Sequence, residues 1–251
     1  MNNARLKVFP ILLLILLVHG GCSMNNHLPA TQRTFDTEDF ARQREKMVNE
    51  QLRARDIKDE RVLAAMLKVP RHEFVTPEFT ELAYQDGALP IRQGQTISQP
   101  YIVAHMTELL ELRAGDRVLE VGTGSGYQAA VLSPLVAAVY SVEIVEALAR
   151  RAAESFAALG YENIFSRCGN GYEGWPEEAP FDGILVTCAA EDIPRPLWDQ
   201  LRPGGRIVIP VGPEHQVQNL VVVHKRPDGG RRTETISTVR FVPMTGEAQR
   251  Q

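Results

Sequence analysis

The sequence is poor in cysteine and has no excess of positive charge, and both shortages narrow the functions it can have. Its three cysteines cannot all pair within the chain, and no C-x-x-C or Cys/His cluster is present, so we expect no bound metal. The formal net charge of −4 provides no broad basic surface, which argues against nucleic acid as a partner. Cys168 and Cys188 lie in apolar, strand-like segments, and we interpret both as buried free thiols.

Long apolar runs are also lacking, since the N-terminal run Val8–Val18 is too short to span a bilayer comfortably. This run follows two basic residues and precedes Gly20-Gly-Cys22, which is the order of a secretory signal peptide. A cysteine after two glycines resembles a bacterial lipoprotein signal, in which that cysteine is lipidated. We therefore expect export to the cell envelope and a lipid anchor on Cys22. The alternative is an uncleaved apolar tail, or a mis-called start codon, on a cytoplasmic protein.

The rest of the chain suits one large domain. Hydrophobic residues make up 44% of the sequence and charged residues 23%, as in ordinary globular proteins. We divide the chain into a signal (1–22), a polar tether (23–36), one domain (37–245) and a short tail (246–251). A domain of this size has ample core, and we expect it to be a monomer.

Helix-like and strand-like segments alternate through this domain. Thr37 and Asp59 are placed to begin two N-terminal helices. Five strands are then expected near 118–121, 139–143, 163–168, 181–188 and 207–211, with helices between them at 147–159 and 195–201. A turn at Pro227–Gly230 predicts a late hairpin. This order predicts an α/β fold of the Rossmann-like type. In this fold we expect a mostly parallel central sheet with helices on both faces, an N-terminal helical extension and a C-terminal antiparallel hairpin.

The stretch Val118-Leu-Glu-Val-Gly-Thr-Gly-Ser-Gly-Tyr127 has the order strand, glycine loop, helix start. Glycine permits positive φ and close approach of a ligand, and the helix start offers free N–H groups. A nucleotide-like cofactor is held in this way at the first turn of a doubly wound sheet. Tyr127 occupies the third glycine position of the dinucleotide fingerprint, which favours a smaller adenosine cofactor over one with a pyrophosphate. A glycine turn that serves packing alone is the alternative.

An acidic residue about 20 residues further on is expected to bind ribose hydroxyls. Glu143 closes the next strand and fits this expectation. Loop and acid together predict a site for S-adenosylmethionine. The candidate cofactor-binding residues are therefore Gly122, Thr123, Gly124, Ser125, Gly126 and Glu143.

The segment Gly94-Gln-Thr-Ile-Ser-Gln-Pro100 is polar but carries no charge. Thr96 and Ser98 alternate with Ile97, so an extended backbone would turn both hydroxyls to the same side. From these residues alone, the segment is either a functional loop or an ordinary connector.

Together these stretches resemble the protein-L-isoaspartate O-methyltransferase family, from about Arg42 to Thr245. The glycine loop and Pro203-Gly-Gly205 are shared by many methyltransferases, whereas the Thr-Ile-Ser-Gln-Pro segment is far more specific to this family. The residues that carry the resemblance are Val69–Arg71, Phe74-Val75, Ala88–Ile91, Gly94–Pro100, Leu119–Tyr127, Ala179–Asp182, Pro203–Gly205 and Val239–Pro243.

The resemblance implies an enzyme that transfers the methyl group of S-adenosylmethionine to the free α-carboxyl group of L-isoaspartyl residues in age-damaged proteins and peptides. It implies that Ser98 is the active-site residue, and Thr96 is placed to orient the substrate carboxylate. It also places Asn170 near the adenine, where the family generally has aspartate, and Thr245 in a C-terminal stretch that closes over the site. A carboxylate is already ionised at neutral pH, so we expect no general base. A methyltransferase of the same fold acting on a small molecule or RNA is the alternative, and the family is usually cytoplasmic.

Overall fold

The computed structural model describes Met1 and residues 36–214 and 216–246. Nearly all of the predicted signal, including its candidate lipidation site Cys22, lies outside the described residues, as does nearly all of the predicted tether and tail. Within the described part, no helix is long and apolar enough to cross a bilayer.

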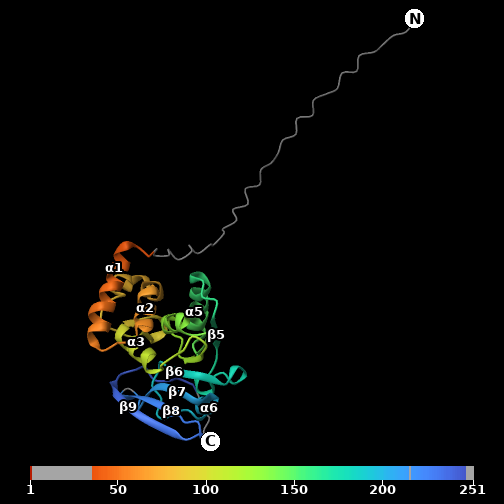
Figure 1. Ribbon diagram of the computed structural model, residues 1–251. Coiled ribbons are helices and arrows are strands. Elements are labelled where there is room, and N and C mark those ends of the chain that lie inside the picture. Colours follow the sequence, from red (N-terminus) through yellow and green to blue (C-terminus); the bar gives the residue numbers. More distant parts are fainter. Residues whose placement is uncertain (2–35, 215, 247–251) are drawn as a thin grey trace. The chain divides into compact units, whose positions relative to one another are not determined.

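The N-terminal helices begin where the sequence predicts. Helix α1 (Glu38–Lys46) starts at Thr37, whose side chain accepts a hydrogen bond from the Phe40 amide, and it continues as a π-helix, η1 (Met47–Leu52). Helix α2 (Glu60–Lys68) is capped in the same way by Asp59. Helix α3 (Pro100–Leu109) then leads toward the sheet. Figure 1 shows these three helices grouped together, in orange to yellow, which is the predicted N-terminal extension.

The central sheet has seven strands in the order β5-β4-β3-β6-β7-β8-β9. Its first five strands are parallel to one another, and β8 and β9 extend it as an antiparallel hairpin. The predicted mixed sheet is therefore confirmed. The strands are β3 (Arg117–Val121), β4 (Ala138–Glu143), β5 (Ile164–Cys168), β6 (Phe181–Val186), β7 (Leu201–Val211), β8 (Gln218–Lys225) and β9 (Arg231–Val239). A separate two-stranded ribbon pairs β1 (Leu89–Pro90) with β2 (Thr96–Ile97).

Successive side chains of the central strands point to opposite faces of the sheet, and each face is buried. Val118 and Val139 pack into one core, together with residues of α1 to α5, among them Phe156 of α5. Leu119 and Val142 pack into a second core with Leu197 of α6. Helices therefore cover both faces, as predicted. The remaining helices are α4 (Tyr127–Leu132), α5 (Glu146–Leu159) and α6 (Arg195–Gln200).

The expectation of two buried thiols is wrong for Cys168. Cys188 is buried, but Cys168 is exposed. Cys168 ends β5, which is an edge strand with β4 as its neighbour, and most of its residues are only partly covered. An apolar sequence pattern identifies a strand but does not tell whether the strand lies at the centre or the edge of its sheet.

Candidate active site

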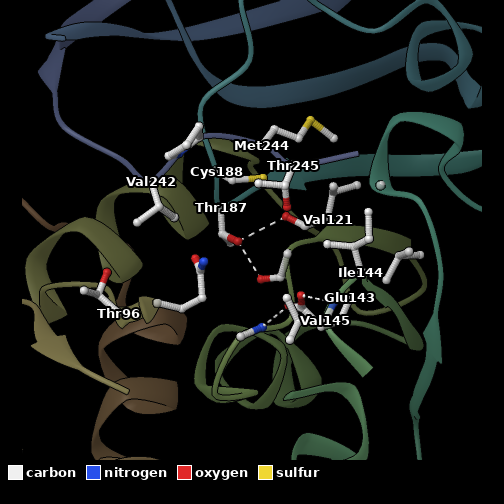
Figure 2. A pocket seen from close by; sticks show the side chains of 16 residues that line it. Thr96, Val121, Glu143, Ile144, Val145, Thr187, Cys188, Val242, Met244 and Thr245 are labelled. Atoms are coloured by element: carbon white, nitrogen blue, oxygen red, sulfur yellow. Dashed lines mark hydrogen bonds between the residues drawn. The ribbon is translucent and has the colours of Figure 1, made fainter. Parts of the chain in front are cut away.

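A pocket lies at the carboxyl ends of β3, β4 and β6, where ligands bind in open α/β sheets (Figure 2). About 550 Å³ of space, part of it open solvent, lies between its walls. Five of the predicted site residues share its wall. The lining residues are Gln95, Thr96, Val121, Gly122, Gly124, Val142, Glu143, Ile144, Val145, Gly171, Thr187, Cys188, Val242, Pro243, Met244 and Thr245.

The glycine loop follows β3 directly and is held by Thr187, the residue after β6. The Thr187 hydroxyl contacts the carbonyl oxygens of Gly122 at 2.6 Å and Val121 at 3.1 Å (Figure 2). Gly122 has φ +95°, and a Cβ on it would lie 2.4 Å from the Thr187 hydroxyl oxygen, so only glycine fits. Gly124 has φ +53°, and a Cβ there would meet its nearest atoms only at 3.9 Å and beyond. The backbone at Gly124 is therefore open to a ligand. Thr187 was not predicted from the sequence as a site residue, although it is a polar residue that directly follows an apolar strand.

Glu143 is buried at the end of β4 and points into the pocket. One carboxylate oxygen accepts a hydrogen bond from the Gly124 amide at 2.8 Å, and the other accepts from the Val145 amide at 2.9 Å. Each oxygen keeps lone-pair capacity for a further donor. The carboxylate thus joins the glycine loop to the next loop and can still accept from ligand hydroxyls.

Two other predicted loop residues do not line the pocket. Gly126 is the N-cap of α4 with φ +89°, and a Cβ on it would lie 2.7 Å from the ring of Phe156 in α5. The Ser125 hydroxyl accepts a hydrogen bond from the Tyr127 amide at 3.3 Å. These two residues shape the loop and its packing, whereas Gly122 and Gly124 face the pocket.

Thr123 is also turned away from the pocket, into a buried network beneath the loop. Its hydroxyl lies 2.5 Å from the Ser141 hydroxyl, which in turn donates to the Glu120 carboxyl group. Glu120 and Ser141 are register partners on β3 and β4, and both are fully buried. Burial raises the pKa of Glu120 to about 8, and the nearby charge of Glu143 adds to this. Glu120 was not singled out from the sequence, although an acid inside an apolar strand is a visible signal.

The raised pKa of Glu120 makes stability depend on pH. Because the native state keeps this proton up to about pH 8 and the unfolded chain releases it near 4.5, unfolding releases a proton between these values. The free energy of unfolding should therefore fall as pH rises through this window, by about 1 kcal/mol per pH unit from this group. Urea unfolding of the wild type and Glu120→Gln at several pH values measures the effect. Equal pH slopes in the two proteins would contradict the prediction.

The uncharged segment 94–100 reaches the pocket through Gln95 and Thr96. Thr96 is exposed, Ile97 is buried and Ser98 is half-buried, which matches the predicted alternation. Ser98 does not line the pocket but lies two residues from Thr96. Its carbonyl oxygen accepts a hydrogen bond from Arg71 at 2.8 Å, a contact that leaves the hydroxyl available.

A C-terminal strap, defined here as residues 242–245, supplies another part of the wall. The Ala189 amide donates to the Val242 carbonyl oxygen at 2.9 Å, and the Met244 amide donates back to Ala189 at 2.7 Å. The Tyr172 hydroxyl also donates to the Met244 carbonyl oxygen, at 3.3 Å. Thr245 lies at the pocket, as the resemblance implies.

Asn170 does not line the pocket, whereas its neighbour Gly171 does. The side-chain oxygen of Asn170 accepts a hydrogen bond from the Tyr172 amide at 3.1 Å and caps the short 3-10 helix η7 (Gly171–Glu173). In this geometry Asn170 shapes the turn after β5. Its contact with adenine stays a prediction.

Acid–base or nucleophilic groups are scarce around the pocket. Burial, with the nearby Glu143, raises the pKa of the Cys188 thiol to about 12, so it is neutral and a poor nucleophile at neutral pH. No group of three or more His, Cys, Asp or Glu side chains in the described part of the chain is placed to hold a metal ion. The pocket therefore offers positioning contacts rather than an activated nucleophile.

Comparison with known proteins identifies the family. The model of the family "Protein-L-isoaspartate(D-aspartate) O-methyltransferase" matches residues 42–249. The chain belongs to this family. The sequence-based prediction of the family, its reaction and its cofactor is thereby confirmed.

Relatives within the protein-L-isoaspartate O-methyltransferase family match nearly the whole chain. The protein-L-isoaspartate O-methyltransferase of Opitutus terrae is 52% identical, over 98% of this chain and 99% of its own length. That of Shewanella sediminis is 56% identical, over 86% and 88%. A solved protein-L-isoaspartate O-methyltransferase superposes with a TM-score of 0.75 at 32% identity, covering 82% of this chain and 67% of its own. A putative one from Plasmodium falciparum, in complex with S-adenosyl-L-homocysteine, has a TM-score of 0.68 at 26% identity, over 80% and 98%.

The pocket fits the family's cofactor on its own geometry. Gly124 leaves space against the backbone, which suits close approach of the methionine portion. Glu143 has carboxylate capacity left after its two backbone contacts, which suits the ribose hydroxyls. Gly122, Gly124 and Glu143, with the strap beside them, are the residues that would hold S-adenosylmethionine.

Proposed function

We propose that this chain repairs damaged proteins by methylating the free α-carboxyl group of L-isoaspartyl residues, with Ser98 and Thr96 orienting that carboxylate. Family membership is the evidence for the reaction. One structural observation supports the role of Thr96: this residue, from the segment specific to this family, lines the same pocket as Glu143 and the glycine loop. Ser98 lies two residues further along the same segment. The acceptor-side segment and the cofactor-side residues are therefore neighbours in space.

The chemistry requires alignment more than acid–base catalysis. When bound, S-adenosylmethionine supplies a methyl group already activated on a sulfonium sulfur. The substrate carboxylate is ionised at neutral pH and needs no base to remove a proton. Opposite charges partly cancel as the reaction proceeds, so added charge in the pocket would help little. Hydrogen bonds from Ser98 and Thr96 can fix the carboxylate in line, and the strap can limit water.

Replacing Ser98 by alanine is expected to lower kcat/KM for an isoaspartyl peptide about 10- to 100-fold, because one contact that positions the carboxylate is lost. Methyl transfer to the peptide is measured alongside the Kd of S-adenosylhomocysteine, which should stay near the wild-type value. Ser237→Ala, on the exposed face of β9, serves as the matched control. Wild-type turnover by the Ser98 variant would remove Ser98 from the reaction.

The N-terminal segment belongs to this proposal as well: the chain is exported to the envelope and lipidated on Cys22. The order of basic residues, apolar run and Gly-Gly-Cys supports this. The match to the Opitutus terrae relative covers 98% of the chain and so includes most of this segment. Mass spectrometry of the native N-terminus, with Cys22→Ala as control, tests the idea. An intact Met1 on protein from the cytoplasmic fraction would refute it.

A further inference from the structure

Arg71 is a fully buried cation that donates hydrogen bonds to two backbone carbonyl groups. It opens the 3-10 helix η3 (Arg71–Phe74) and has a relative exposure of 0%. Its Nε donates to the Ala83 carbonyl oxygen at 2.7 Å, and its Nη2 donates to that of Ser98 at 2.8 Å. Burying a charge costs free energy that two neutral acceptors only partly offset. A buried arginine of this kind therefore contributes little to the free energy of unfolding.

Besides Ala83, Arg71 contacts two residues that lie in or next to the two halves of the reaction site. Ser98 lies in the segment that we assign to the carboxylate acceptor. Tyr127 is the first residue of α4, directly after the glycine loop, and the Arg71 guanidinium carbon lies 4.8 Å from the centre of its ring. One planar group therefore holds the backbone of the acceptor segment and stacks on the residue that follows the cofactor loop.

We propose that Arg71 is a positioning residue for methyl transfer, which fixes the backbone of Ser98 relative to the start of α4 and hence to the glycine loop. This inference rests on the role proposed above for Ser98. A guanidinium is suited to this task because its rigid fork donates in two directions while its face stacks on an aromatic ring. Lysine keeps the charge but lacks the fork.

Arg71→Lys tests the proposal with the least change in charge and volume. The expected result is a 10- to 100-fold fall in kcat for an isoaspartyl peptide, since a displacement of about 1 Å can cost 100-fold in rate. The Kd of S-adenosylhomocysteine should change less than about 3-fold, since Arg71 touches neither Glu143 nor the pocket face of the loop. Wild-type kcat in the Arg71→Lys protein would overturn the proposal.

A double-mutant cycle separates this inference from the role of Ser98 itself. If Arg71 acts through Ser98, the cost of Arg71→Lys should shrink markedly in a Ser98→Ala background. Fully additive costs would overturn the proposal for Arg71 and leave Ser98 assigned. Wild-type turnover by Ser98→Ala alone would instead reject the role of Ser98.

Arg44→Lys is the matched control for loss of a buried arginine. Arg44 donates to the Leu67 carbonyl oxygen at 2.6 Å and to the Tyr84 hydroxyl at 3.1 Å, and it pairs with Asp36. It is buried in the N-terminal helices and contacts neither reaction-site loop. We expect Arg44→Lys to lower Tm while leaving kcat unchanged at 25 °C. If Arg71→Lys likewise lowers Tm but spares kcat, Arg71 is structural and the proposal fails.

Discussion

Replacing Glu143 by alanine is expected to weaken binding of S-adenosylhomocysteine by about 100- to 10,000-fold. A hydrogen bond to a charged group contributes about 1.5–3 kcal/mol, and two ribose hydroxyls would lose theirs. The same change strips the amides of Gly124 and Val145 of their acceptors, which lie at 2.8 and 2.9 Å. The glycine loop would then lose the contact that ties it to the loop after β4.

Isothermal titration of wild type and variants measures this effect. Glu143→Gln keeps one carbonyl acceptor and should give an intermediate loss of about 10-fold, because its bond to a ribose hydroxyl is no longer charge-assisted. Glu146→Ala changes an exposed carboxylate only three residues away, in the first turn of α5, and should leave the Kd unaltered. A Kd for Glu143→Ala within about 3-fold of wild type would rule out the ribose contact.

Gly126→Ala is expected to lower the free energy of unfolding by about 3 kcal/mol. The left-handed backbone at φ +89° costs a residue with a Cβ about 1–2 kcal/mol. The new methyl group would also lie 2.7 and 2.9 Å from ring atoms of Phe156, and such overpacking costs about 1–3 kcal/mol. Because Gly126 caps α4, a shift there also moves the cofactor loop. Urea unfolding monitored by circular dichroism measures the stability change.

Gly160 provides the control for backbone strain without overlap. It has φ +76° at the end of α5, and no atom lies within 4 Å of a Cβ built on it. Gly160→Ala should therefore show the strain cost alone. Phe156→Leu combined with Gly126→Ala should regain part of the packing cost. Equal losses in the two glycine variants would show that the Phe156 contact does not matter.

Most of the fold could be predicted from local patterns in the sequence. Thr37 and Asp59 cap helices through amides two or three residues away, and Gly160 ends α5 with φ +76°. These interactions are decided by neighbours in the chain, so they are readable there. The glycine loop with Glu143 was predictable for a similar reason, because a strand, a tight turn and a helix in sequence fix where the carboxyl edge lies.

The parts that were not predicted depend on contacts between distant segments. Cys168 is exposed because β5 lies at a sheet edge, which only the strand order reveals. Thr123 faces a buried network because β3 and β4 pair with Glu120 opposite Ser141. The bridge from Arg71 to Ser98 joins residues 27 positions apart. A motif indicates which residues gather at a site, but tertiary packing determines which of their side chains face the ligand.

The strap has a kinetic consequence. Its two backbone hydrogen bonds with Ala189 must open if residues 242–245 are to swing away from the pocket. Spent cofactor that leaves past the strap is then released no faster than this local unfolding allows, so the strap would act as a gate on turnover. Amide hydrogen exchange at Met244 reports the free energy of that opening directly. Its protection should rise when product is bound and fall when Tyr172 loses its hydroxyl, which donates to the Met244 carbonyl.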